Sequence, residues 1–250
     1  MIGRSTWTGL VAVGFAAALS TVSCSVDNRQ LLTSSSGVDP SFGGSGAGSS
    51  SAGDTSDSGA PNDPGPLPVC DYGNGVAPGC DTLVDNPGFT KDTFGWKPED
   101  PTVTMTWSDS DSGANRKSGS MAVVNTLFGE ADGTASRGSA QCLPTHAGQA
   151  YSFALDIFIP KGQGGGLDGG AYTGSAGLSV LFFTSDQCSD YTLSSATSGV
   201  VDESDAWQHR EGRAVTPEGA QSMLVRLVTF KNFREFSFEA RFDNVLLRAD

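Results

Sequence analysis

The chain has few of the residues on which catalysis and nucleic-acid binding usually depend. Only two histidines, His146 and His209, occur in 250 residues, and neither lies in a nucleophile-elbow or HExxH pattern. Lysine and arginine number 15 against 28 aspartates and glutamates, so the net charge is -13, whereas phosphate binding requires a cationic surface. CxxC spacing is also missing. These absences disfavour a histidine-dependent enzyme, a zinc protein and a nucleic-acid partner.

The chain also lacks an apolar run of the ~20 residues that a membrane-spanning helix needs. Its apolar segment near the N-terminus, residues 10–19, follows a basic head with Arg4 and leads into Ser20-Thr-Val-Ser-Cys24. This order is typical of an export signal. The cysteine resembles that of the bacterial lipobox, where small residues precede a cysteine that becomes acylated, although Thr21 stands where that family usually has leucine.

We therefore expect residues 1–23 to be a lipoprotein signal peptide and Cys24 to be lipidated. The alternative is an ordinary secretory signal that is cut near Ser23. Ser25 follows the cysteine, and by resemblance to the enterobacterial sorting rule this favours the outer membrane. The predicted location is the outer membrane or cell surface of a Gram-negative bacterium, with membrane contact through the lipid anchor only.

Residues 24–69 have the composition of a disordered linker. The segment 42–51 is almost entirely glycine and serine, and four prolines follow between residues 61 and 68. Such a segment buries too little apolar surface to offset the entropy of ordering it. We expect it to tether a folded domain over residues 70–250.

Four cysteines follow Cys24, and in an exported protein they indicate two disulfides with three possible pairings. We favour Cys70–Cys80, because these two close a short turn-rich loop, and Cys142–Cys188, because these two lie in strand-like segments.

Period-two alternation of apolar and polar residues predicts β-strands through most of the domain. It is clearest in residues 102–107, 151–159 and the closing stretch 236–247. In that closing stretch the apolar set changes parity at Asp243-Asn244, which suggests a bulge. No stretch shows a 3.6-residue apolar repeat. About nine strands favour an all-β fold, an antiparallel two-sheet β-sandwich.

Several short motifs occur in a familiar order: Asn86-Pro-Gly-Phe89, Gly95-Trp96, Gln141-Cys142, Gly148-Gln-Ala-Tyr151, Pro217-Glu-Gly-Ala220 and Phe242-Asp-Asn-Val245. Together they resemble the carbohydrate-binding modules of the family 4/9/22 (CenC-like) kind over residues 83–248. This resemblance implies a galactose-binding-like jelly roll, a Cys142–Cys188 disulfide and non-catalytic glycan binding. It also implies a structural calcium ion, with Asp243 as the first candidate ligand and Asn86 as the second. Thr90 departs from the pattern, because the family often has glutamate there.

Sugar binding of this kind uses aromatic faces for C–H-rich ring planes and polar groups for hydroxyls. Tyr172, Tyr191 and Arg226 are the candidate ligand-binding residues, because each falls outside the core alternation. The tryptophans of the domain are instead expected to pack in the core: Trp96, Trp107 and Trp207.

The favoured function is a non-catalytic glycan-binding module displayed on a lipid anchor. The first alternative is a structural or adhesion lipoprotein with the same fold and no sugar site. The second is a polysaccharide-active hydrolase or lyase, for which a carboxylate pair could come from Glu211, Glu235 and Glu239. Glu239 shares its strand face with Arg241, and a plain cross-strand charge ladder explains both residues without catalysis.

Overall fold

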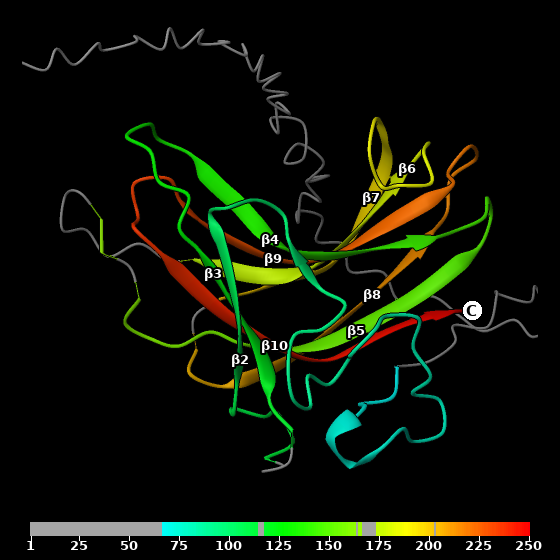
Figure 1. The fold of residues 1–250 in the computed structure, drawn as a ribbon, viewed down its shortest axis with the longest axis horizontal. Coiled ribbons are helices and arrows are strands. Elements are labelled where there is room, and N and C mark those ends of the chain that lie inside the picture. The colour runs from blue at the N-terminus through cyan, green and yellow to red at the C-terminus, as the bar shows by residue number, and fades with distance from the viewer. Residues whose placement is uncertain (1–66, 115–117, 164, 167–173, 203) are drawn as a thin grey trace, which may run out of the picture. The chain divides into compact units, whose positions relative to one another are not determined.

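The computed structural model describes residues 67–250 apart from 115–117, 164, 167–173 and 203. Within these residues, ten strands form two antiparallel five-stranded sheets that enclose a core (Figure 1). Sheet A has the strand order β1 (Lys97–Pro98), β4 (Thr134–Pro144), β9 (Ser222–Asn232), β6 (Ser175–Phe183) and β7 (Thr192–Asp202). Sheet B has the order β2 (Val103–Ser108), β3 (Ser120–Asn125), β10 (Phe238–Ala249), β5 (Ala150–Phe158) and β8 (Trp207–Val215).

The all-β sandwich predicted from the sequence is therefore confirmed, with ten strands instead of about nine. The described residues also include one short 3₁₀ turn, η2 (Tyr72–Asn74). None of the helical structure in this part of the chain has the length and apolarity to cross a membrane.

The eight strands from β3 to β10 pair in a nested order. β3 pairs with β10, β4 with β9, β5 with β8, and β6 with β7. This nesting alternates the chain between the two sheets and is the arrangement of a jelly roll. The two remaining strands, β1 and β2, extend the sheets at their edges beside β4 and β3.

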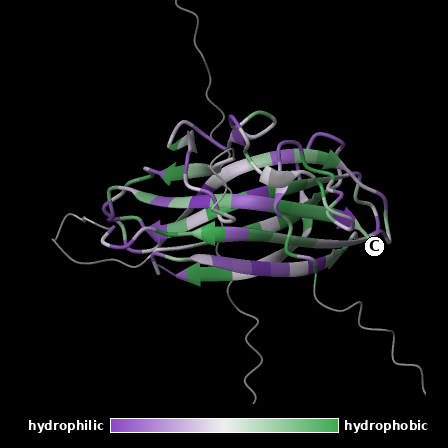
Figure 2. Ribbon diagram, turned by 90° about the horizontal axis from the view of Figure 1, so that it is seen from below, coloured by the Kyte–Doolittle hydropathy of each residue, from purple (hydrophilic) through white to green (hydrophobic). Residues whose placement is uncertain are grey.

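The core lies between the sheets because each strand turns alternate side chains inward. Phe238, Ala240 and Phe242 of β10 are buried there, as are Phe153 and Leu155 of β5. Figure 2 shows apolar and polar bands alternating along several strands. The alternate side chains of sheet B therefore form an outer face, and that face carries the candidate site.

The bulge expected in the closing strand is present. The pairing of β10 with β5 shifts register between Asp243 and Leu246, and Asn244 has a positive φ of 50°. After the shift, Val245 and Leu247 become the buried core residues. The strand begins at Phe238, so the sequence prediction was wrong to start it at Phe236, which is 53% exposed.

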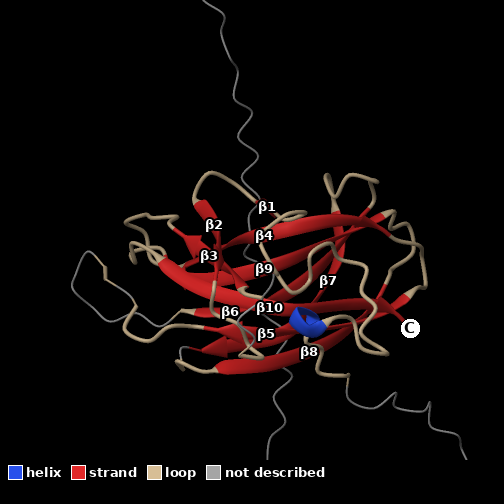
Figure 3. Cartoon of the chain, turned by 60° about the horizontal axis from the view of Figure 1, so that its bottom comes forward, coloured by secondary structure: helices blue, strands red, loops and turns tan. Residues whose placement is uncertain are grey.

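Both predicted disulfides are present, Cys70–Cys80 and Cys142–Cys188. The first one closes a segment that we call the strap, residues 67–82. Leu67, Cys70, Tyr72 and Cys80 form a small apolar cluster with Ala154 of β5 and Leu246 of β10, so the strap covers part of the outer face of sheet B. Figure 3 shows η2 beside the strands of this sheet.

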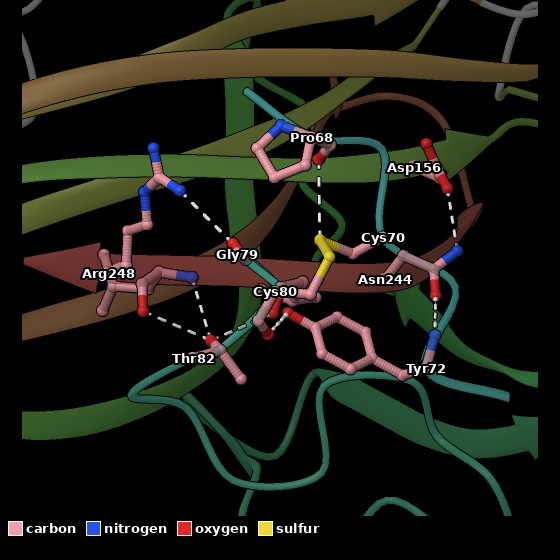
Figure 4. Close-up of a disulfide and its surroundings, with 11 residues drawn as sticks. Pro68, Cys70, Tyr72, Gly79, Cys80, Thr82, Asp156, Asn244 and Arg248 are labelled. Carbon is pink, nitrogen blue, oxygen red and sulfur yellow. Dashed lines mark hydrogen bonds between the residues drawn. A yellow bond between two sulfur atoms is a disulfide. The ribbon is translucent and has the colours of Figure 1, made fainter. Parts of the chain in front are cut away.

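Hydrogen bonds fix the strap to β10 (Figure 4). The backbone N–H of Tyr72 donates to Asn244 Oδ1 at 3.1 Å, and the Tyr72 hydroxyl donates to the Cys80 carbonyl at 2.8 Å. At the far end, Thr82 Oγ1 accepts from the Leu247 N–H at 2.9 Å. The strap is thus a fixed cover over one part of the sheet.

Candidate functional site

Beyond the strap, a row of side chains crosses the outer face of sheet B from edge to edge. Each strand contributes one residue in direct register with the next: Thr106 of β2, Ala122 of β3, Arg241 of β10, Phe158 of β5 and Trp207 of β8. We call these five residues the transverse row. With neighbouring strands ~4.8 Å apart, the row is about 19 Å long.

The aromatic half of the row consists of Phe158 and Trp207. Their ring centroids lie 5.5 Å apart with the planes tilted by 46°. The guanidinium of Arg241 lies over the Phe158 ring, 5.5 Å from its centroid, which is within the range of a cation–π contact. Phe158 and Trp207 are both partly exposed, so the row presents aromatic surface to solvent.

The polar half of the row borders an open pocket of about 410 Å³. The residues that line it are Thr106, Trp107, Ser108, Asp109, Ala122, Glu239 and Arg241. Ala122 has the smallest of these side chains, so it leaves a depression in the outer face of the sheet between Thr106 and Arg241. Arg241 Nε donates to Glu239 Oε1 at 2.9 Å, and both side chains are about 30% exposed. The pocket therefore offers donors and acceptors, with the arginine charge locally balanced.

A buried polar cluster lies next to the row, where the turn after β2 meets β5, β8 and β10. Ser112 donates its backbone N–H to Asp243 Oδ2 at 3.0 Å and its hydroxyl to Asp156 Oδ2 at 2.9 Å. Asn244 Nδ2 donates to the same Asp156 oxygen at 2.9 Å. His209 Nδ1 contacts Asp156 Oδ1 at 2.9 Å. These contacts fasten the turn onto the sheet beside the transverse row.

Burial and hydrogen bonding move the pKa values of this cluster in different directions. Burial raises the pKa of Asp243 to about 7, although the N–H groups of Ser112 and Asn244 oppose the rise. For Asp156, burial also acts to raise the pKa, but hydrogen bonds from His209, Asn244 and Ser112 outweigh it and the pKa is lowered. The hydrogen bond to Asp156 raises the pKa of His209.

The two predicted calcium ligands lie in different surroundings. Asp243 is 1% exposed, and its two oxygens accept from the N–H groups of Ser112 and Asn244. Asn86 has a positive φ of 49° and donates its side-chain amide to the Asp92 carbonyl at 2.8 Å. Among the described residues, no three or more acidic, histidine or cysteine side chains form a group able to hold a metal. The calcium site stays a prediction.

The predicted ligand-binding residues do not lie on the transverse row. Arg226, on sheet A, forms a two-pronged ion pair with Glu99, in which Nη2 donates to Oε2 at 2.9 Å. Tyr191 is 73% exposed and precedes β7 in the same sheet. The next residue, Thr192, stands opposite Phe183 of β6, which is four positions, about 13 Å, along that strand from Ser179, the partner of Arg226. Tyr172 and the lipidation candidate Cys24 lie outside the described residues.

The prediction that the tryptophans pack in the core is only partly correct. Trp96 is buried, but Trp107 is 41% exposed and donates its indole N–H to the Phe89 carbonyl at 2.6 Å. Trp207 stands on the outer face opposite Phe158, because β8 turns Gly212 and Ala214 inward. In residues 151–158 the alternation of apolar and polar residues shows clearly which side chains face the core. The strand β8 has too few apolar residues to show this.

The three candidate catalytic carboxylates are separated. Glu211 accepts from the backbone N–H of Leu67 in the strap at 3.1 Å, and Glu239 pairs with Arg241. Glu235 is fully buried in the connection between β9 and β10. Glu239 and Arg241 therefore form an ion pair within β10, but their cross-strand partners are uncharged: Val124 stands opposite Glu239, and Ala122 and Phe158 stand opposite Arg241. The predicted cross-strand charge ladder was wrong.

No protein-family model matches this chain, and no curated protein matches it. Several of its structural neighbours are carbohydrate-binding modules. One similar structure comprises the CBM22-1–GH10 modules of Clostridium thermocellum xylanase 10B, complexed with xylohexaose, at 16% identity and a TM-score of 0.47. The match covers 68% of this chain and only 29% of that one.

A second similar structure is the CBM22-2 xylan-binding domain of Paenibacillus barcinonensis Xyn10C, at 11% identity and a TM-score of 0.44, covering 66% of this chain and 98% of that one. A third is a cyclase from Fischerella sp. TAU, at 17% identity and a TM-score of 0.45, covering 68% of this chain and 96% of that one. Likeness at this level concerns the fold alone, so the function is argued from the residues of this chain.

Proposed function

We propose that this chain is a non-catalytic carbohydrate-binding protein whose ligand lies along the transverse row. The observation that carries the proposal is the row itself: five registered side chains that join a partly exposed aromatic pair to a polar pocket across the whole of sheet B. Sugars have apolar C–H faces and polar edges, and a surface that alternates in the same way complements them.

The charges on the row favour a neutral sugar. Arg241 is engaged by Glu239 and by the Phe158 ring, so it is available as a hydrogen-bond donor for hydroxyls more than as a partner for a carboxylate. The net charge of -13 also repels anionic polysaccharides. Because sheet strands carry the row, its groups are positioned before the ligand arrives, which lowers the entropy cost of binding.

We propose further that a lipid on Cys24 displays this domain at the cell surface, with residues 25–69 as the tether. This part of the proposal rests on the sequence pattern of the N-terminal region. Mass spectrometry of the protein extracted from membranes tests it: a diacylglycerol-modified Cys24 at the N-terminus supports the anchor, and an unmodified N-terminus near Cys24 contradicts it.

The test of the sugar site is affinity electrophoresis of the protein in gels that contain soluble neutral polysaccharides, with Trp207→Ala and Phe158→Ala as variants. We expect each variant to weaken binding about tenfold, because stacking of an aromatic ring contributes roughly 1 kcal/mol beyond its buried area. Phe94→Ala is the matched control, since Phe94 is 75% exposed and belongs neither to the row nor to the residues that line its pocket. Wild-type affinity in both row variants would reject the site, and a folded protein that binds no polysaccharide would favour the adhesion alternative.

A further inference from the structure

A second aromatic surface lies at the end of the sandwich where β3 ends and β10 begins. Phe128, in the connection from β3 to β4, and Phe236, in the connection from β9 to β10, are 41% and 53% exposed. Their ring centroids are 5.3 Å apart and their planes differ by 23°. We call this pair the aromatic tip. Neither residue was selected from the sequence as a ligand contact.

The tip is held together by a lysine that is itself buried. Lys231 is 2% exposed, and its ammonium donates to the carbonyls of Leu127 and Glu235, at 2.5 Å in each case. These two residues immediately precede Phe128 and Phe236. One buried side chain therefore fixes the two backbone segments that carry the stacked rings.

Further contacts make the same end of the sandwich rigid. The N–H of Phe236 donates to the Gly165 carbonyl at 3.0 Å, and the N–H of Gly129 donates to the Phe233 carbonyl at 3.0 Å. The Phe233 ring lies against Gly133, where an added side-chain carbon would come within 3.4 Å of it. The exposed rings therefore sit on a fixed support, and a preorganised apolar surface loses little freedom when a ligand binds.

The size and charge of the tip limit what it can bind. If about half of each phenylalanine side chain is exposed, the apolar surface that the tip offers is on the order of 200 Å². A stable protein interface needs about 800 Å² per partner, so the tip alone is too small for one. Glu130 and Asp132 are exposed beside it, and Asp132 pairs with Arg234 at 3.6 Å. Carboxylates at this position repel an anionic lipid surface but accept hydrogen bonds from hydroxyls.

We propose that the aromatic tip is a second carbohydrate-binding site, which stacks a single neutral sugar ring and acts separately from the transverse row. Phe236 precedes Arg241 by five residues, the first two of them before β10, so their backbones are at most about 17 Å apart. Two weak sites at such a separation raise the affinity for a long polysaccharide because the second contact becomes intramolecular. A monosaccharide gains nothing from this effect.

The experiment uses the full chain and four variants: Trp207→Ala, the double variant Phe128→Leu with Phe236→Leu, all three changes combined, and Phe94→Leu as a control. Leucine keeps apolar volume at the tip but removes the ring face. Affinity electrophoresis in soluble xylan, β-1,4-galactan, mannan and β-glucan is the first readout. We expect the leucine double variant to bind the retained polysaccharide about tenfold more weakly than the control, and the combined variant to lose binding.

A fluorescent reporter separates the two sites. Phe236→Trp in a Trp207→Phe background keeps a ring at the tip, and the Trp207→Phe parent, which retains Trp96 and Trp107, is its reference. We expect the reporter to change its emission more than the parent does when xylose, galactose, mannose or glucose is added at millimolar concentration. Wild-type retardation of the leucine double variant in every gel, with an unchanged emission of the reporter, would overturn the second site while leaving the row intact.

Wild-type retardation of Trp207→Ala, with the tip reporter still responding to sugar, would reject the row and retain the tip. Co-sedimentation with phosphatidylcholine vesicles tests whether the tip binds a membrane instead of a sugar. Vesicle binding that disappears in the leucine double variant, together with a reporter that is silent to sugars, would identify the tip as a membrane contact and overturn the proposal.

Discussion

Asp243 is the residue whose ionisation should be most visible in stability. Its pKa of about 7 in the folded protein lies above the value of ~3.9 in an unfolded chain, so the folded state binds the proton more tightly. Between these two values the stability falls as the pH rises, by roughly 4 kcal/mol in total. His209 acts in the same direction, because its raised pKa gives a stabilisation that is lost as the pH rises through the folded value.

Asp156 acts in the opposite direction. Its lowered pKa gives a stabilisation that is present above ~3.9 and is lost as the pH falls through the folded value. The three groups together predict greatest stability near pH 4, with a decline on both sides. Asp243→Asn should flatten the decline from pH 5 to pH 8, as measured by denaturant unfolding at both values. A variant that declines as steeply as wild type would contradict this role for Asp243.

Calcium, if it binds at Asp243, would hold that carboxylate ionised and reverse the cost of burying it. We predict that millimolar calcium at pH 8 raises the unfolding temperature of wild type and leaves that of Asp243→Asn unchanged. The measurement is a thermal melt with calcium and with a chelator. Equal calcium effects on both proteins would reject a metal role for this residue.

Asn244 combines a left-handed backbone with three hydrogen bonds. It accepts from the Tyr72 N–H and donates to Ser112 Oγ and Asp156 Oδ2. Asn244→Gly keeps the backbone conformation and should cost about 2 kcal/mol through the lost hydrogen bonds. Asn244→Ala should cost ~1 kcal/mol more, because alanine is strained at a φ of 50°. Chemical unfolding checks the order, and an equal loss in the two variants would show that the backbone strain is negligible.

At the scale of elements, the two disulfides constrain different amounts of chain. Cys142–Cys188 spans a sequence separation of 46 residues and joins the β4 segment of sheet A to the connection between β6 and β7. By the chain-entropy account its loop contributes about 4 kcal/mol, and the shorter Cys70–Cys80 loop about 2.7 kcal/mol. We therefore expect the double serine variant at residues 142 and 188 to be less stable than the double serine variant at residues 70 and 80.

The shorter disulfide should act mainly on the strap. A double serine variant at Cys70 and Cys80 is predicted to increase hydrogen exchange at Leu246 and Leu247 of β10, which the strap covers and bonds. Polysaccharide binding at the transverse row should be unchanged, because the row lies beyond the strap. A large loss of binding in this variant would show that the strap supports the row.

At the scale of the whole molecule, local alternation predicted most of the sandwich. The buried sets of β5 and β10 and the parity change at Asp243-Asn244 follow from residue order. The favoured cysteine pairing, one of three that the sequence allows, is the one present. The strands β1 and β7 were missed: β1 has only two residues, both exposed, and β7 is a mostly polar and exposed run without clear apolar periodicity. Phe236 was assigned to the strand, because a local pattern does not show where pairing begins.

The transverse row could not be predicted in the same way. It depends on which residues of five strands stand opposite one another, and that register is set by turns and by the packing of the core. Trp207, Phe158 and Arg241 come from distant parts of the chain, and only pairing brings them together. Arg226, which the pattern correctly turned away from the core, found a partner in Glu99.

The strap also determines how a mechanical load enters the domain. A pull that arrives through the residues before Leu67 meets the Cys70–Cys80 bond, which transfers tension directly from Cys70 to Cys80 and leaves the chain between them unloaded. The tension then reaches Leu83, whose N–H donates to the Leu247 carbonyl of β10 at 2.8 Å. Because β10 lies in the middle of sheet B, between β3 and β5, the pull is shared by two flanking ladders. Tyr72 lies within the bypassed chain and therefore stays unloaded while the protein is held under tension.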